Sequence, residues 1–515
     1  PAGLVAPDDT GPFECDVCVI GSGAGGAVVA ARLAKAGHRV LIVESGSYRD
    51  RTGFTGREGD SMESMFQRHG LLTTKDLAFQ VLAGDTAGGS TTVNWMTCLR
   101  PPPFVRREWE AAGVAGASQA GFDGHLASAW DRLAVGRSES TVNPSNEVLR
   151  LGAVRLGYSA GTDYDMIDRN AVGCANRCDY CSFGCPYDAK RSTLVTYLPD
   201  ALEAGGRLLC DARVDHVRID AGRATGVLAH RRTSHGTASV EIRARSVVVA
   251  AGSVQTPAIL RRSGVTHAGV GRGFRLHPTT ALIGEYPHRV EAWKGPMQTV
   301  VIRKFVTSDA GEHGPWIESA PAHPGIAAIA IPWAGGASHK EAMARLPRAA
   351  ATIVLVRDVG EGRVGLDRAG ESELTYRLHR RDRANLVRGI VEAARVHQAA
   401  GAVRIQTLHA AEITAGDGSR PISTSELDRF IDEVQRAGIV ENAIQLFSAH
   451  PTGSARIGRD PRTAATGPDG DCFGVEGLWV GDGSLLPTAA GVNPMITIMA
   501  FAERTAEAVH RRLAG

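Results

Sequence analysis

The sequence lacks long hydrophobic runs, is poor in aromatic residues and carries no excess of either charge. No apolar stretch approaches the roughly 18 residues of a membrane span, so we expect no transmembrane segment. Aromatic residues make up 5% of the 515 residues, which disfavours a stacking platform for a sugar. The net charge of +2 is too balanced to favour a nucleic-acid partner.

The N-terminal segment and the number of cysteines bear on the cellular compartment of the protein. The segment PAGLVAPDDTGPFE has neither the basic region nor the apolar region of a secretory signal. Nine cysteines is an odd number for a large chain, and this is typical of a reducing compartment where most thiols are simply buried. We therefore expect a cytoplasmic protein.

Glycine, in contrast, is abundant. The 61 glycines indicate many tight turns and close approaches of the backbone to a ligand. The chain is longer than one compact core normally needs, so we expect two or three lobes. Its content of 43% hydrophobic and 22% charged residues is ordinary for a globular enzyme.

A strand–turn–helix–strand pattern near the N-terminus predicts a dinucleotide site. An apolar run at 17–20 is followed by GSGAGG, which fits G-x-G-x-x-G, and then by helix-forming residues at 27–36. A second apolar run at 40–43 ends in Glu44. This order and spacing are those of a nucleotide-binding βαβ unit.

Each residue type in this pattern has a physical task. Gly21 permits the tight turn, Gly23 lets the backbone approach a pyrophosphate, and Gly26 lets the helix pack closely on the strand. The helix N-terminus offers N–H groups to the phosphates. Glu44 can accept hydrogen bonds from ribose hydroxyls and disfavours a 2′-phosphate. The segment alone fits the ADP half of FAD and of NAD equally.

The remaining chain predicts a second lobe of different character. Segment 103–205 is mostly helical in pattern, and segment 244–264 is typical of a second βα turn on the first sheet. From about 286 to 440 the pattern predicts a substrate lobe on a largely antiparallel sheet. Its predicted strands lie within 327–333, 350–367 and 374–382, and its predicted helices at 381–400 and 425–438.

Five segments resemble the glucose–methanol–choline (GMC) oxidoreductases, which are FAD enzymes. They are VIGSGAGGAVVAARLA, GGSTTVNW, VVVAAGSVQTPAIL, HPTGSARIG and GLWVGDGSLLPTAAGVNPMITIMAFAER. The resemblance covers nearly the whole chain. The last segment is similar to the cholesterol oxidase and long-chain-alcohol oxidase branches, while GGSTTVNW and GCPYDAKRST indicate the long-chain branch.

The resemblance implies an α/β fold in discontinuous parts. A Rossmann-like FAD-binding domain of the GMC type is expected at 14–100, 205–285 and 441–515. An insertion at 101–204 carries a cysteine cluster. A discontinuous second, substrate-binding domain on a mostly antiparallel sheet is expected at 286–440.

The resemblance also implies a set of FAD-contacting residues. Those expected at the ADP half are Gly21, Gly23, Gly26, Glu44, Val214, Ala251 and Gly252. Those expected along the pyrophosphate, ribityl chain and flavin ring are Gly88, Gly89, Ser90, Asn94, Asp482, Asn493 and Pro494. Many family members carry His where this chain has Asn493, so the resemblance to glucose and choline oxidases is weaker.

Two residues are predicted to be catalytic. Oxidation of an alcohol removes a proton from oxygen and a hydride from carbon, and the hydride goes to flavin N5. His450 is the expected proton acceptor because an imidazole titrates near neutral pH. Asn493 is expected to donate to the substrate oxygen and orient the alcohol. His277, in RLHPTT, is interpreted as structural.

Four cysteines in CANRCDYCSFGCPYDAK, at 174–190, leave three readings open. Cys174, Cys178, Cys181 and Cys185 contain the spacing C-x2-C-x3-C-P, which resembles that of iron–sulfur ligands. Four thiolates also suit a structural zinc. Disulfides or free thiols are the third reading. A cluster would imply an external electron acceptor, whereas its absence leaves oxygen as an acceptor.

The expected function is FAD-dependent oxidation of a hydrophobic or bulky alcohol, with O2 or an external acceptor as the second substrate. Two alternatives remain. Hydroxynitrile lyases share the fold and keep FAD without net redox chemistry, and an iron–sulfur relay would suit a dehydrogenase of a sugar or other polyol. The sequence does not identify the alcohol.

Overall fold

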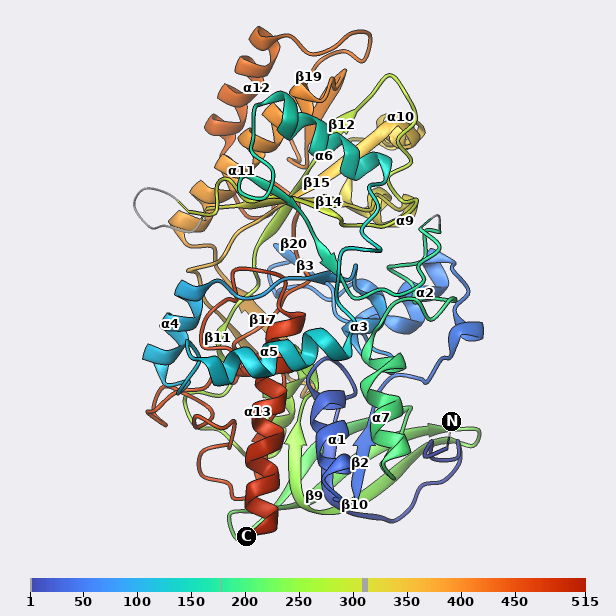
Figure 1. The fold of residues 1–515 in the computed structure, drawn as a ribbon, viewed down its shortest axis with the longest axis vertical. Coiled ribbons are helices and arrows are strands. Elements are labelled where there is room, and N and C mark those ends of the chain that lie inside the picture. Colours follow the sequence, from blue (N-terminus) through green and yellow to red (C-terminus); the bar gives the residue numbers. More distant parts are fainter. Residues whose placement is uncertain (1, 177, 308–313) are drawn as a thin grey trace.

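The computed structural model describes residues 2–176, 178–307 and 314–515. These residues form two lobes that are stacked along the longest axis of the molecule, and each lobe is built on one large sheet (Figure 1). Both chain ends lie in the same lobe, at the lower end of the view.

The first sheet is the dinucleotide-binding sheet that the N-terminal pattern predicts. Its order is β7-β2-β1-β10-β9-β8, and β21 also pairs with β10. The pairs β7–β2, β2–β1, β1–β10 and β10–β21 are parallel, whereas the pairs β10–β9 and β9–β8 are antiparallel. The bounds are β1 Phe13–Ile20, β2 Val40–Val43, β7 Arg207–Leu209, β8 Ala212–Asp220, β9 Arg223–Thr233, β10 Gly236–Val249 and β21 Leu478–Val480.

Helices connected to these strands pack on the sheet. Helix α1 (Gly26–Lys35) packs on α7 (Tyr197–Glu203) and on the C-terminal α13 (Met495–Ala514). Helix α8 (Gly252–Arg262) follows β10 directly. A side chain at Gly26 would place Cβ 2.0 Å from the carbonyl oxygen of Gly21, so only glycine allows α1 to start this close to the strand.

The second sheet has nine strands and is mostly antiparallel, which confirms the predicted architecture. Its main path is β19-β18-β12-β15-β14-β13-β5, and β20 joins β3 to β12. Its bounds are β3 Phe79–Val81, β5 Tyr164–Met166, β12 Thr279–Glu285, β13 Val300–Ile302, β14 Trp316–Ala320, β15 Ala349–Leu355, β18 Arg404–Thr407, β19 Thr414–Ala415 and β20 Leu446–Ser448. Helices of this lobe are α6 Pro144–Arg155, α9 Pro324–Ala330, α10 Gly336–Arg345, α11 Arg380–Ala399 and α12 Thr424–Ala437.

The structure differs from the sequence-based expectation in three places. The segment 374–382, predicted as a strand, is a strand only up to Tyr376, and its last residues begin α11 at Arg380. Segment 327–333 is not a strand, because α9 begins with a proline at its first turn and continues to Ala330. The predicted domain limit at 285 is the last residue of β12, which is a strand of the second sheet, as is β20 within 441–515. Strand formation with distant segments decides these boundaries, and local periodicity does not encode it.

Smaller elements complete the chain. The remaining helices are α2 Glu58–Met65, α3 Ser90–Val93, α4 Pro103–Ala112 and α5 Ala120–Arg132. The remaining strands are β4 Thr97–Cys98, β6 Asp168–Arg169, β11 Arg272–Phe274, β16 Gly362–Leu366 and β17 Ser372–Tyr376. Within the described residues, no helix has the length and apolar character needed to cross a membrane.

Candidate active site

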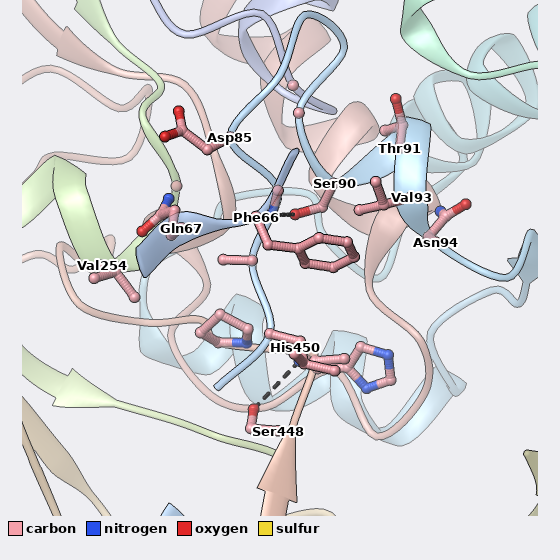
Figure 2. A pocket seen from close by; sticks show the side chains of 18 of the residues that line it. Phe66, Gln67, Asp85, Ser90, Thr91, Val93, Asn94, Val254, Ser448 and His450 are labelled. Atoms are coloured by element: carbon pink, nitrogen blue, oxygen red, sulfur yellow. Dashed lines mark hydrogen bonds between the residues drawn. The ribbon is translucent and has the colours of Figure 1, made fainter. Parts of the chain in front are cut away.

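A cavity of about 550 Å³ lies between the two lobes and is lined by both sheets. Of the residues predicted to bind FAD or substrate, only Gly26 and Gly88 lie outside its wall. Those that line it are Gly21, Gly23, Glu44, Gly89, Ser90, Asn94, Val214, Ala251, Gly252, His450, Asp482, Asn493 and Pro494. Figure 2 shows Ser448 and His450 on one side of this cavity and Ser90, Thr91 and Asn94 on the other.

Glu44 is held in a fixed position at the end of β2. Its Oε2 accepts hydrogen bonds from the backbone N–H (2.9 Å) and the hydroxyl (2.6 Å) of Ser22, and its Oε1 accepts from the N–H of Gly46 (2.9 Å). Burial raises the pKa of Glu44, while these donors oppose the rise. The carboxylate is therefore fixed in the cavity wall, where the sequence predicts a ribose.

The two glycine-rich turns meet next to it. The Cα atom of Gly23 lies against Gly89, where an added Cβ would come within 2.8 Å of it. The hydroxyl of Ser22 accepts a hydrogen bond from the N–H of Gly88 at 2.9 Å, so one serine links both turns and Glu44. Gly252 has a φ of 79° and open space where its side chain would be. Such bare backbone is suited to contact with a pyrophosphate.

Asp482 joins three segments at the carboxyl edge of the first sheet. Its Oδ2 accepts hydrogen bonds from the N–H of Gly252 (2.8 Å) and the hydroxyl of Thr256 (2.5 Å), and its Oδ1 accepts from the N–H of Ser484 (2.8 Å). Burial raises its pKa, and these donors oppose that effect. Asp482 therefore fixes the start of α8 against the loop after β21.

His450 is paired with a second histidine that the sequence reading treats as structural. The Nδ1 atoms of His277 and His450 are 2.9 Å apart, and the backbone N–H of His450 donates to Ser448 Oγ at 3.3 Å (Figure 2). Burial lowers the pKa of His450 to about 4, and burial also lowers the pKa of His277 well below its ordinary value, with a contribution from His450. Both rings are neutral at neutral pH, so one Nδ1–H donates to the other Nδ1.

Asn493 is oriented by a buried carboxyl group from β14. Glu318 accepts a hydrogen bond from the side chain of Asn493 and another from Gln298 Nε2 at 3.1 Å. Gln298 in turn accepts from the hydroxyl of Thr97 at 2.6 Å. Burial raises the pKa of Glu318 to about 7, although both donors oppose the rise. This network fixes which way the amide of Asn493 points into the cavity.

Lys190 ties the cysteine-rich loop to the cavity wall. Its buried Nζ donates to the carbonyl oxygens of Thr92 (2.8 Å), Asn94 (2.7 Å) and Cys181 (2.6 Å). Burial lowers its pKa to about 8, so the group is an ammonium at neutral pH. Three donors meet three backbone acceptors, which fully satisfies the group.

The structure does not support the iron–sulfur or zinc reading of Cys174, Cys178, Cys181 and Cys185. Among the described residues, no group of three or more His, Cys, Asp or Glu side chains is placed to hold a metal ion. The four sulfurs are not in disulfides. Burial raises the pKa of Cys181 to about 11, so its thiol stays protonated. The loop is instead tied to residues 92–94 by Lys190, and close spacing in sequence does not place the thiols as a ligand set.

Two glycine turns of a dinucleotide-binding sheet open onto the cavity, which also contains a histidine and an oriented amide. This arrangement is typical of a cofactor-dependent oxidoreductase. The N-terminal and C-terminal models of the GMC oxidoreductases match residues 62–279 and 359–502, and a NAD(P)-binding Rossmann-like model matches 19–57. The chain belongs to the GMC oxidoreductase family. It is therefore an oxidoreductase that acts on CH–OH groups and uses FAD.

Similar sequences include two plant enzymes. The chain is 36% identical to long-chain-alcohol oxidase FAO4B of Arabidopsis thaliana, over 96% of this chain and 67% of the relative. It is 33% identical to long-chain-alcohol oxidase FAO1 of the same plant, over 98% and 68%. An uncharacterized GMC-type oxidoreductase of Mycobacterium tuberculosis is 34% identical over 99% of this chain and 78% of the relative.

Solved structures share the fold at low sequence identity. Pyridoxine 4-oxidase from Mesorbium loti has a TM-score of 0.67 and 16% identity, over 96% of this chain and 99% of that one. A variant of the Aspergillus oryzae formate oxidase has a TM-score of 0.68 and 15% identity, over 98% and 99%. At this identity the likeness concerns the arrangement of the two lobes alone.

Three residues of the site were not predicted to be functional from the sequence. His277, Glu318 and Lys190 are far from His450 and Asn493 in the chain, and only the fold brings them together. Lys190 lies within GCPYDAKRST, a segment that the sequence analysis had already singled out for its cysteines. Glu318 lies in a buried strand segment, where a lone acid is the signal that could have identified it.

Proposed function

We propose that the protein oxidises a hydrophobic alcohol to its carbonyl compound, with His450 as the proton acceptor. The observation that carries this proposal is that His450 and Asn493 line one cavity together with the residues expected at the flavin. FAD, when bound, supplies the acceptor for the hydride at N5. Glu44, the two glycine turns and Asp482 would hold it, and their geometry fits a dinucleotide.

His450 can take the hydroxyl proton because its pairing leaves one ring nitrogen for the substrate. His277 engages Nδ1 of His450 at 2.9 Å, so Nε2 remains for the cavity. For Nε2 to accept a proton, Nδ1 of His450 must carry hydrogen and donate to His277. His277 then keeps the ring in the productive tautomer and stabilises it when it becomes protonated, which is a positioning role.

Asn493 has an amide that can hold the substrate oxygen. One of its N–H groups is directed to Glu318, and an amide has a second N–H to donate. Donation to the alcohol oxygen would align the reacting C–H bond. Because the rest of the substrate side of the cavity is lined mainly by alanine, isoleucine and leucine, a hydrophobic alcohol fits it. The names of the plant relatives agree with this choice.

Anaerobic mixing with alcohols tests this function. A long-chain primary alcohol should bleach the visible flavin band, because two electrons enter the flavin and none leave. A hydroxynitrile lyase would leave the band unchanged while it cleaves a cyanohydrin. Readmission of O2, or addition of an artificial acceptor, then shows which of the two reoxidises the flavin.

The low pKa of His450 predicts an unusual pH profile. The rate of flavin reduction by substrate should stay constant through neutral pH and fall only as the pH drops toward about 4, where His450 becomes protonated. Stopped-flow reduction measured at each pH at which the holoenzyme stays folded checks this. A rate that falls with a midpoint near the ordinary imidazole pKa of about 6.5 would contradict it.

The cofactor is expected to be held without a covalent bond. The segment GGSTTVNW contains no histidine that could be linked to the flavin ring. Acid precipitation of the holoenzyme should therefore release the yellow FAD into the supernatant, where its absorbance spectrum identifies it. A yellow pellet with a colourless supernatant is the contrary result.

A further inference from the structure

Two neighbouring strands of the second sheet line the substrate side of the cavity along its length. The side chains at 279, 281 and 283 on β12 and at 349, 351, 353 and 355 on β15 all line it. The strands are antiparallel, with Thr279 opposite Leu355, Ala281 opposite Ile353, and Ile283 opposite Ala351. Since side chains alternate along a strand, these residues form one continuous face of small and aliphatic groups.

This face starts near His450 and ends at charged residues. Thr279 is paired with Phe447 of β20, three residues before His450. At the other end of β12, Glu285 is on the same face and is paired with Ala349. Six residues of extended strand separate Thr279 from Glu285, which corresponds to about 20 Å. We call this apolar face of β12 and β15 the corridor; it is long enough to accompany an extended alkyl chain.

A second, small cavity of about 30 Å³ lies at this far end. It shares four wall residues with the large cavity, namely Ile283, Ile331, Leu346 and Ala349. Its other walls are Glu285, Ala342, Arg345, Arg404 and Gln406. The far end of the apolar face thus adjoins a site with two guanidinium groups and one carboxylate, and four side chains separate or border both cavities.

The charged groups at the far end do not satisfy one another. Glu285 Oε2 lies 3.5 Å from Arg345 Nε and 3.6 Å from Arg404 Nε, which is ion pairing without hydrogen bonds. The atoms Glu285 Oε2 and Arg404 Nε are buried, and neither has a hydrogen-bond partner among the described residues. The two guanidinium groups face one carboxylate, so the site keeps one surplus positive charge and N–H groups without an acceptor in the described part of the chain.

We propose that this far end binds the carboxylate of a long-chain ω-hydroxy acid whose hydroxyl group reaches His450. The inference rests on the proposed function, because it places the alcohol end of the same chain at the flavin. A carboxylate accepts hydrogen bonds from both guanidinium groups. A single surplus positive charge matches this monoanion better than the dianion of a phosphate ester. A methyl terminus would leave the buried polar atoms unpaired.

The test compares three substrates of one chain length on the FAD-loaded enzyme, as kcat/KM of anaerobic flavin reduction. They are the ω-hydroxy acid, its methyl ester and the primary alcohol. The acid should exceed the ester by about tenfold or more, the usual value of one to two charged hydrogen bonds. In a series of acids, the advantage should vanish for chains too short to span the corridor. Equal rates for acid and ester, or an advantage independent of length, would overturn the proposal.

Variants localise the effect. Arg345→Met should remove most of the acid's advantage through KM and leave kcat and the primary alcohol nearly unchanged, because the lost contact is remote from the reacting carbon. Arg404→Met provides a second test should one variant fail to fold. Arg289→Met, whose exposed guanidinium pairs with Glu291, is the matched control. An advantage that persists in both cavity variants refutes the site, whereas no bleaching by any of the three substrates refutes the proposed function instead.

Discussion

His450→Ala should bind FAD normally and yet be reduced by its alcohol at least about 10²-fold more slowly than the wild-type enzyme. Loss of a general base commonly has this effect, because the hydroxyl proton then has no acceptor as the hydride leaves. The backbone contact of His450 to Ser448 does not involve the imidazole, so the wall should keep its shape. Stopped-flow flavin reduction at saturating alcohol gives the rate directly.

A buried histidine elsewhere separates catalysis from the effect of burial. His397 is also buried and its pKa is also lowered to about 4, but it bonds Tyr286 and Thr352 and does not line the cavity. His397→Gln is therefore expected to reduce stability while the rate per bound FAD stays near that of the wild type. If His450→Ala holoenzyme is reduced as fast as the wild type, His450 is not the base.

The nucleotide-binding half could be predicted because its signals are local. Strand β1, the glycine turn, α1, β2 and Glu44 follow each other within 13–44, and each has a sequence signature that does not depend on distant residues. The strand predictions at 350–367 and the helices at 381–400 and 425–438 are also confirmed, since strong periodicity or capping residues define them. Here local preference and tertiary structure agree.

The substrate half could be predicted only in outline because its site is built from pairings across the chain. The face formed by Ala281, Ile283 and Ala351 exists only because β12 and β15 pair in one register. His277 reaches His450 over 173 residues, and Glu318 contacts Asn493 from another strand. No spacing rule within one segment encodes such contacts.

The cysteine loop shows how a strong local pattern can mislead. Four thiols within twelve positions favour a metal site by spacing, but among the described residues no such ligand group forms, and a lysine ammonium links the loop to residues 92–94 instead. The ammonium donates to backbone carbonyl groups of Thr92 in α3, of the C-cap residue Asn94 and of Cys181 in the loop. The residue that organises the segment is thus Lys190, which no metal motif contains.

Lys190→Met should lower the free energy of unfolding by about 3–5 kcal/mol and weaken FAD binding, because it leaves buried carbonyl groups of Thr92, Asn94 and Cys181 without a donor. Asn94 lines the cavity, so its displacement disturbs the flavin side of the wall. Thermal unfolding of the holoenzyme, followed by the fluorescence of released FAD, measures both effects. The matched control is Lys35→Met, whose half-exposed ammonium pairs with Asp200 and should contribute about 1 kcal/mol or less. Equal unfolding temperatures for the two variants would show that Lys190 does not hold the cysteine loop against the active site.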